Sequence, residues 1–437
     1  MKFSNLKFSN LNNLKFSNLK WMGLCLLALT ACDKGTDIDN PEGPQGSGTM
    51  QALSPEESRA FIEETAGKFL MKFNPADQQE IIELAAYYDT TYGSYKLPEN
   101  FYEIIGEIVP TPGEYLRHLL EATGGDLSSL TRSATDFSFG AIFKELCGIY
   151  QPDAATQSWV KTSSSDDIEF QFKNMAGEPA VMKVAQQGMG TDRVNVTVDL
   201  TDNGVQLANS VVSSSYDSKK HTISADVDAR MMNLRAQTEI EGKDEIVESR
   251  SEFFISNEKM STAYATLKGS GLCDAARWKE LKDTESLLLD NLIGKMVKKG
   301  YGGVDVMGAI QVYGQMDYYE KLPLDIAGEF AGWGSTDKNM VKNACQEACD
   351  RLNKNIKSQV RYNGTKTDQA TLLFQPGYKE WDTMWGYSAT PMIQFPDHTL
   401  YTPAEYFAGF ADMAPKLGAL LEAYQKIWIE ASMGAGE

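Results

Sequence analysis

The hydrophobic positions of this chain follow a helical period, then a strand period, then a helical period again. Between residues 54 and 147, apolar side chains recur every three or four positions, whereas from about 157 to 267 they alternate with polar ones. From residue 274 onwards the helical spacing returns. The first spacing predicts amphipathic helices and the second predicts half-buried strands. We therefore predict an α+β fold, in which an antiparallel β-meander of about eight strands is flanked by N-terminal and C-terminal helical segments.

Turn residues separate the predicted strands. Asn203-Gly204 is the strongest of these signals, because both central positions of a tight hairpin turn need a positive φ. Glu241-Gly242-Lys243 is a further turn, and no helix intervenes for a parallel crossover, so the strands are predicted to be antiparallel. One side of these strands is very polar and includes Ser213, Asp226 and Asp228, which we interpret as the solvent side of half-buried strands.

Capping signals mark the starts of three predicted helices. Ser54-Pro55-Glu56-Glu57, Thr111-Pro112-Gly113-Glu114 and Thr402-Pro403-Ala404-Glu405 each combine a capping side chain, a proline and an acid three residues after the cap. The proline needs no amide partner at that position, and the acid favours the positive end of the helix. The third signal predicts one long terminal helix.

The segment after the meander is predicted to be mainly helical. Apolar stripes at helical spacing occupy residues 274 to 360, and the glycines around Gly302 are interpreted as the end of a helix. Two short strands are predicted at 371 to 375 and at 391 to 395.

The charge balance excludes one class of partner. The 437 residues include 41 Lys and Arg against 60 Asp and Glu, which gives a net charge of -19. A polyphosphate backbone would be repelled by that field, so we predict no nucleic-acid binding.

The N-terminus carries a targeting signal. Residues 1 to 20 contain four lysines and no acid, an apolar run follows from Trp21 to Ala28, and Leu29, Thr30, Ala31 and Cys32 come directly after it. The run is too short to remain as a spanning helix. This arrangement resembles the signal peptide and lipobox of bacterial outer-membrane lipoproteins of the Bacteroidetes type. The resemblance implies cleavage before Cys32 and lipidation of Cys32, which would anchor the protein in the outer membrane, with display at the cell surface as a further expectation.

The predicted organisation follows from these signals. Residues 1–31 form the signal peptide and residues 32–53 the lipidated cysteine with a flexible tether rich in Pro, Gly and Ser. Residues 54–150 form a helical segment, 151–272 the antiparallel β-meander, and 273–437 a mainly helical segment packed with the rest as one domain.

The remaining cysteines are candidates for disulfides. Cys147, Cys273, Cys345 and Cys349 are an even number in what the signal predicts to be an oxidising compartment, so we expect at least one bridge. Cys345 and Cys349 are one helical turn apart, near the upper limit of disulfide geometry, and Cys147 and Cys273 flank the meander. Three pairings remain open, and buried free thiols are the alternative.

Catalytic and metal-binding patterns were not found. The three histidines have no ligand spacing, and no nucleophile motif with its companion elements occurs. We therefore assign no catalytic residue, metal ligand or cofactor, and leave enzymatic activity open while favouring a non-enzymatic protein.

One aromatic cluster is a candidate binding site. Trp381, Trp385 and Tyr387 lie in a stretch rich in Gly and Pro, interpreted as a loop from 377 to 397. Exposed aromatic faces stack on sugars or peptides, and binding residues concentrate on loops. The alternative is that these rings pack between the two predicted late strands.

Three functions remain open at this point. The first is a non-enzymatic envelope module that binds a glycan or an envelope protein. The second is a lipid or hydrophobic-ligand carrier, which needs an enclosed apolar cavity. The third is a glycan-active hydrolase, which needs a pair of carboxylates that the sequence does not single out.

Overall fold

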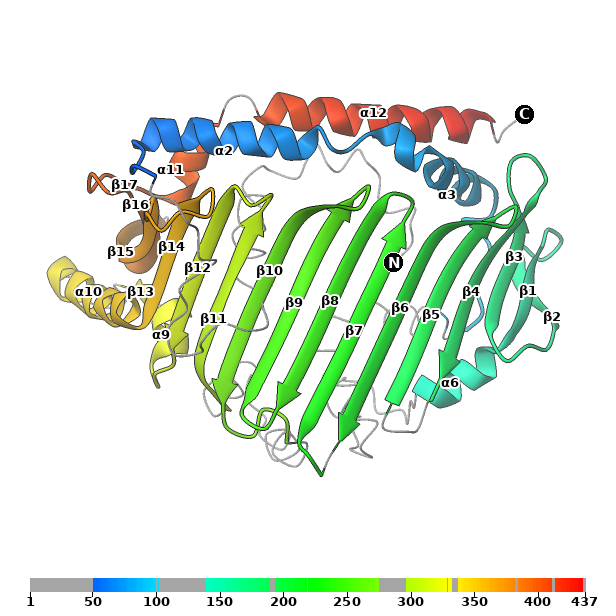
Figure 1. Ribbon diagram of the computed structural model, residues 1–437, viewed down its shortest axis with the longest axis horizontal. Coiled ribbons are helices and arrows are strands. Elements are labelled where there is room, and N and C mark those ends of the chain that lie inside the picture. The colour runs from blue at the N-terminus through cyan, green and yellow to red at the C-terminus, as the bar shows by residue number, and fades with distance from the viewer. Residues whose placement is uncertain are drawn as a thin grey trace.

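The computed structural model describes residues 50–99, 101, 139–188, 193–217, 219–274, 296–327, 329–331, 337–381, 384–410 and 413–434. Within these residues one open sheet of 17 strands runs through the molecule, and helices occupy the N-terminal and C-terminal parts (Figure 1). The α+β class is confirmed. The prediction of about eight strands is wrong, because the sheet extends far beyond the meander on its C-terminal side.

The described helices lie before and after the long run of strands. They are α2 (Pro55–Leu70), the short 3₁₀ helix η3 (Pro75–Gln78), α3 (Gln79–Thr91), α6 (Phe139–Leu146), α9 (Leu322–Ala327), α10 (Lys338–Asn355), α11 (Pro403–Ala408) and α12 (Met413–Gly434). The strands are β1 (Gly148–Asp153), β2 (Ser158–Ser163), β3 (Ile168–Lys173), β4 (Pro179–Gln187), β5 (Arg193–Asp202), β6 (Val205–Asp217), β7 (Thr222–Met231), β8 (Leu234–Lys243), β9 (Ile246–Ile255), β10 (Glu258–Gly269), β11 (Val297–Val306), β12 (Ile310–Asp317), β13 (Glu329–Ala331), β14 (Ile356–Tyr362), β15 (Ala370–Trp381), β16 (Met384–Gln394) and β17 (Leu400–Tyr401).

The strands follow chain order across most of the sheet. From β3 to β12 each strand pairs antiparallel with the next. At one end β1 lies parallel to β3 and antiparallel to β2. At the other end β12 pairs with β14, β14 with β15 and β15 with β16, and the short strands β13 and β17 pair with β16. The predicted antiparallel meander is thus the central part of a longer antiparallel array.

The strand registers define two faces of this sheet. Residues that lie opposite each other in paired strands point to the same face of the sheet. Followed from strand to strand, the pairing places Val184 of β4, Val198 of β5, Thr238 of β8 and Tyr313 of β12 on one face. We call this side the first face. The other side, which carries Glu239 in the same strands, is the second face.

The N-terminal half of the sheet buries its first face. Ile168 and Val184 are fully buried there, and Phe143 and Leu146 of α6 and Leu84 of α3 join the same cluster. A neighbouring cluster under β6 and β7 has Tyr216, Ile223, Ala225, Leu272, Cys273, Met296 and Val297 as its buried members. Alternating apolar residues in these strands therefore point to one core, as their period of 2 predicts.

The C-terminal half packs its second face instead. Ala370 of β15 and Phe395 are buried against Tyr406 of α11, and the half-buried Val360 of β14 and Ile62 of α2 pack on them. Ala370 is opposite Val360 in the register, which places both on the second face. The two halves of one sheet are therefore held by clusters on opposite faces.

The strands between these clusters are polar on the second face and mixed on the first. In β8, Gln237 and Glu239 lie on the second face while Ala236 and Thr238 lie on the first, and Ala236 is exposed. Thr238 hydrogen-bonds to Ser251 of β9 across the first face, with the two hydroxyl oxygens 3.0 Å apart. The centre of the sheet is thus held by its backbone ladder, by cross-strand pairs and by apolar contacts on the first face, where Ile240 and Val247 pack against the neighbouring cluster and Ile255 is buried.

Helices cross the ends of these central strands. α12 packs on α3 and α2, and together they form a row along one rim of the sheet (Figure 1). Gln78 is 2% exposed; its amide nitrogen donates to Asn233 in the β7–β8 turn, and its carbonyl oxygen accepts from the Tyr424 hydroxyl at 2.6 Å. The ring of Phe253 in β9 stacks on Phe73 at 6.2 Å between centroids. The rim is therefore tied to the central strands.

The helix signals were good guides to helix starts. The capping boxes of Ser54 and Thr402 form as predicted, and Asn74 caps η3. The signal at Thr111 lies outside the described residues. The prediction of one long terminal helix is wrong, because α11 ends at Ala408 and α12 begins at Met413.

The prediction for residues 273–437 is also wrong in the proportion of helix to strand. Strands β11, β12 and β14 replace much of the predicted helix, and the two late strands are long rather than short. The glycines around Gly302 lie within β11, not at a helix end. At Gly303 a Cβ atom would lie 2.6 Å from both the Tyr264 hydroxyl and the Val312 carbonyl oxygen, so the close approach of Tyr264 explains the glycine.

Gly303→Ala is expected to lower the free energy of unfolding by about 1 to 3 kcal/mol, since the new methyl group would press on the backbone of β12. Gly314→Ala is the matched control, because its Cβ would meet the nearest backbone oxygen at an ordinary 3.5 Å. Urea unfolding measures both. Equal stability of the two variants would contradict the close packing of Tyr264 on β11.

Candidate functional site

The predicted aromatic loop is a β-hairpin. β15 and β16 pair from Thr371 to Trp381, and Tyr378 lies opposite Tyr387 while Glu380 lies opposite Trp385. The loop prediction is therefore wrong, because Gly377 and Pro391 are accommodated inside paired strands. The side chain of Trp381 lies outside the described residues.

The three described rings of this hairpin share the second face of the sheet. Tyr378 is 44% exposed, Trp385 and Tyr387 are half-buried, and the Tyr378 and Tyr387 rings meet edge to face at 5.5 Å. We call Tyr378, Trp385 and Tyr387 the aromatic platform. The predicted binding residues Trp385 and Tyr387 are brought together, and sequence reasoning missed Tyr378.

The first residue of α10 lies over this platform. The Lys338 ammonium is 5.0 Å from the Tyr378 ring centre and 5.4 Å from that of Trp385, and Nζ lies 3.2 Å from the Tyr378 hydroxyl oxygen. The hydrogen bond with Tyr378 is the main cause that raises the pKa of Lys338, and the nearby Glu380 carboxylate contributes. The platform is thus flanked by one cation and one anion.

The four candidate cysteines are free thiols in the structure. Cys345 and Cys349 are both fully buried on one face of α10, and the hydrogen bond between their thiols lowers the pKa of Cys345. Cys147 lies before β1, whereas Cys273 is beside β9, with its sulfur 3.9 Å from the Ile246 carbonyl oxygen. Seven strand spacings separate β1 from β9, roughly 30 Å along the sheet, so these two cannot form a bridge in this fold.

The lipobox residues Leu29, Thr30, Ala31 and Cys32 lie outside the described residues. No helix among the described residues is long and apolar enough to cross a membrane. Within the same residues, no group of three or more His, Cys, Asp or Glu side chains is arranged to hold a metal ion.

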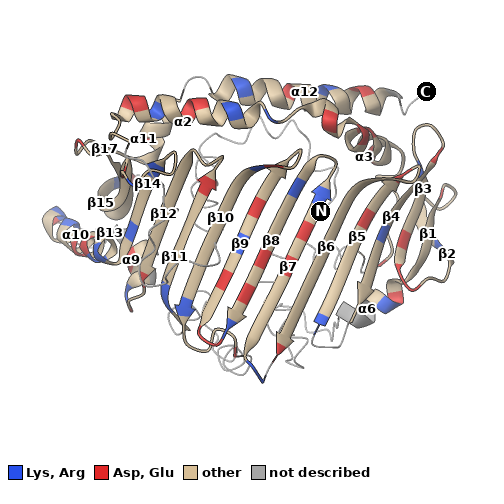
Figure 2. Ribbon diagram, viewed as in Figure 1, with Lys and Arg blue, Asp and Glu red and all other residues tan. Residues whose placement is uncertain are grey.

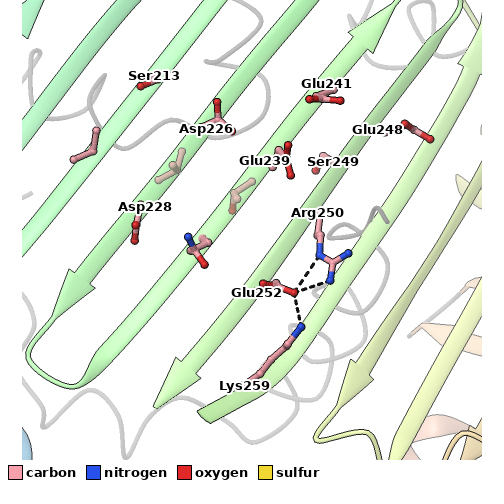
Figure 3. Close-up of a pocket in the computed structure, with 14 residues that line it drawn as sticks. Ser213, Asp226, Asp228, Glu239, Glu241, Glu248, Ser249, Arg250, Glu252 and Lys259 are labelled. Atoms are coloured by element: carbon pink, nitrogen blue, oxygen red, sulfur yellow. Dashed lines mark hydrogen bonds and ion pairs between the residues drawn. The ribbon is translucent and has the colours of Figure 1, made fainter. Parts of the chain in front are cut away.

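A polar hollow lies on the second face of the central strands. It has a volume of about 620 Å³ and is built on β6 to β10 (Figure 3). Its charged lining is mostly acidic. Figure 2 shows acidic residues along β7, β8 and β9. The lining residues are Val211, Ser213, Asp226, Val227, Asp228, Gln237, Thr238, Glu239, Glu241, Glu248, Ser249, Arg250, Glu252 and Lys259.

Two like-charge pairs lie directly opposite each other in this hollow. Asp226 of β7 faces Glu239 of β8, and Glu241 of β8 faces Glu248 of β9. Opposed residues in antiparallel strands have Cβ atoms about 5 Å apart, and like charges at that distance destabilise the sheet. Glu239 also lies opposite Arg250 of β9, so acids and a basic side chain alternate across this part of the face.

Other acids in the hollow are neutralised within the chain. The Arg235 guanidinium donates two hydrogen bonds to Asp228, at 2.9 and 2.7 Å, and this is the main cause that lowers the pKa of Asp228 to about 2. Partial burial raises the pKa of Glu252, but hydrogen bonds from Lys259 and Arg250 outweigh it, so the pKa of Glu252 is lowered overall. Both carboxyl groups are therefore charged at neutral pH.

The sequence pattern indicates that one side of these strands is polar, and we interpreted that side as simply exposed to solvent. The signal that could have found the hollow is the alternation of acids in β7, β8 and β9, combined with the short turns that set the register. Without the register, the opposition of Glu241 and Glu248 is not visible.

Comparison with models of known families, with curated proteins and with solved structures yields no match to this chain.

Asp228→Asn is expected to lower the free energy of unfolding by about 1 kcal/mol at pH 7, since a half-exposed ion pair contributes little more. Because the pKa of Asp228 is lowered from 3.8 to about 2, this contribution is complete above about pH 4 and is lost as the pH falls towards 2. Urea unfolding between pH 7 and pH 2 measures whether the unfolding free energies of the wild-type and variant proteins converge. A difference in the free energy of unfolding that persists at pH 2 would contradict the ion pair. Glu248→Gln removes one of two opposed acids and is the control, for which no loss of stability is expected.

Proposed function

We propose that the protein is an envelope lipoprotein, anchored in the outer membrane through Cys32, and that it acts as a non-enzymatic binding module. The acidic hollow on β6 to β10 is its binding site, and the ligand is a polypeptide segment rich in Lys and Arg. The observation that carries this proposal is the excess of six acidic over two basic side chains in an open polar hollow, with Asp226 opposite Glu239 and Glu241 opposite Glu248. A cationic segment would be attracted by this excess of negative charge.

The charge of the whole chain supports the sign of the ligand. A net charge of -19 attracts cationic partners over a long range and raises their rate of association at low salt. The hollow spans five strands, about 20 Å, which suits several side chains of an extended segment rather than one small ion.

Two observations favour binding over hydrolysis. A general acid needs a carboxyl group whose pKa is raised, and the pKa values of Asp228 and Glu252 are lowered instead. The hollow is also an open part of a sheet face, not an enclosed site that excludes water. The carrier alternative has no support here, because the hollow is lined mainly by charged and polar side chains.

A lysine-rich fluorescent peptide is expected to bind the protein at low ionic strength, with affinity falling as salt rises. Glu241→Lys combined with Glu248→Lys should weaken binding about tenfold or more, as measured by fluorescence anisotropy. Glu320→Lys combined with Glu422→Lys changes the net charge equally at exposed sites outside the hollow, and is the matched control. An equal loss of affinity in both double variants would show general charge attraction and refute the site.

The anchor is tested separately. Cys32→Ala should move the protein from the membrane fraction to the soluble fraction, because two or three acyl chains give a stable anchor that the variant lacks. Mass spectrometry of the membrane form should show an acylated Cys32 at the N-terminus. Unchanged membrane partitioning of the variant would refute lipidation at this residue.

A further inference from the structure

The aromatic platform lies on the same face of the sheet as the hollow, but at a different place. Four strand spacings, about 20 Å, separate β15 from β10 at the near side of the hollow. The platform therefore needs an explanation of its own. We propose that Tyr378, Trp385 and Tyr387, with Lys338 and Glu380 at their edge, form a saccharide-binding site for flat, β-linked oligosaccharides whose pyranose hydroxyl groups are equatorial.

The chemistry of the platform points to a ligand with an apolar face and a polar rim. The rings of Tyr378, Trp385 and Tyr387 keep part of their surface exposed, and aromatic faces stack on C–H groups. A pyranose with equatorial hydroxyl groups presents such C–H faces and keeps its hydroxyl groups at the edge of the ring. Lys338 donates and Glu380 accepts hydrogen bonds, so the two suit hydroxyl groups at that edge.

The geometry of the hairpin selects the shape of the ligand. Trp385 and Tyr387 are two residues apart on β16, about 7 Å along the strand, and the register places Tyr378 across from Tyr387. The rings thus extend over a distance that fits more than one sugar of a chain. The Tyr378 and Tyr387 rings meet edge to face, so successive sugars would stack on separate rings. Since Trp385 and Tyr387 follow one extended strand, a ribbon-like saccharide matches their spacing better than a coiled, α-linked one.

Lys338 is an exchangeable occupant of this site. Its ammonium lies over the Tyr378 and Trp385 rings, and Lys338 is exposed. A cation–π contact at an exposed position is weak, so a sugar ring can displace the ammonium and then receive its hydrogen bond. A free cationic ligand is disfavoured, because this lysine already supplies the cation.

The test is isothermal titration of the full chain with cellohexaose and chitohexaose, with maltohexaose as the α-linked comparison. One of the two β-linked probes should bind with a dissociation constant on the order of 1 mM or lower, and maltohexaose should bind at least about tenfold more weakly. Trp385→Ala should weaken binding about tenfold or more, and Trp385→Phe should weaken it less. Tyr301→Ala, a half-buried tyrosine on β11, is the matched control and should leave binding unchanged.

A second measurement does not depend on how the variants fold. The bound oligosaccharide should protect the Lys338 amine of the wild-type protein from an acylating reagent, while the 76% exposed Lys220 side chain reacts at the same rate with and without sugar. Absence of binding by both β-linked probes at about 10 mM would overturn the proposal. Unchanged affinity in Trp385→Ala, or equal labelling of Lys338 with and without sugar, would overturn it as well.

Discussion

The backbone hydrogen-bond ladder from β7 to β10 is the interaction on which the rest of the structure depends. It joins first-face clusters that reach from β3 to β9 to a second-face cluster at β14 to β16, and the second face of the strands between them is polar. Hydrophobic burial stabilises the first face of this centre through Ile240 and Val247, whereas Glu241 on the second face is exposed. The ladder, cross-strand pairs such as Arg235 with Asp228, and the rim contacts of Gln78 and Phe253 supply what packing does not.

Because the two halves of the sheet pack their cores on opposite faces, part of the sheet surface stays available for binding. Since the core of the N-terminal half lies on the first face, the second face of β6 to β10 carries acids in direct opposition. In the C-terminal half α11 and α2 cover part of the same face, and the exposed end of the β15–β16 hairpin carries the aromatic platform. Rigid strands hold both groups of side chains, which favours binding without rearrangement.

The hydrophobic pattern predicted helices and strands well where one face of the element is buried. It failed where the apolar residues follow neither the helical nor the strand period. Alternating residues such as Ile168, Phe170 and Phe172 predicted β3, and Ser54 and Thr402 predicted helix starts, because capping and burial act locally. In β11 the glycines that accommodate Tyr264 look like a helix end, since their cause lies on another strand. The same limit applies to the candidate sites. Trp385 and Tyr387 could be predicted from the sequence as binding residues. Tyr378, Lys338 and the opposed acids could not, because their positions in the sites depend on strand register and on the placement of α10.

Among the residues that the structure describes, Ala236 of β8 is exposed on the first face and Gln237 is half-buried on the second, so the sheet is accessible from both sides at this point. Labelling of single added cysteines in the folded protein by a water-soluble maleimide, located by peptide mass spectrometry, tests this accessibility. Ala236→Cys on the first face of β8 and Gln237→Cys on the second face should both react within the same order of magnitude, while Val184→Cys, at a fully buried first-face position, should react only after unfolding in urea. Protection of either β8 position to the level of Val184→Cys would show that this face of β8 is covered, and would contradict accessibility from both sides.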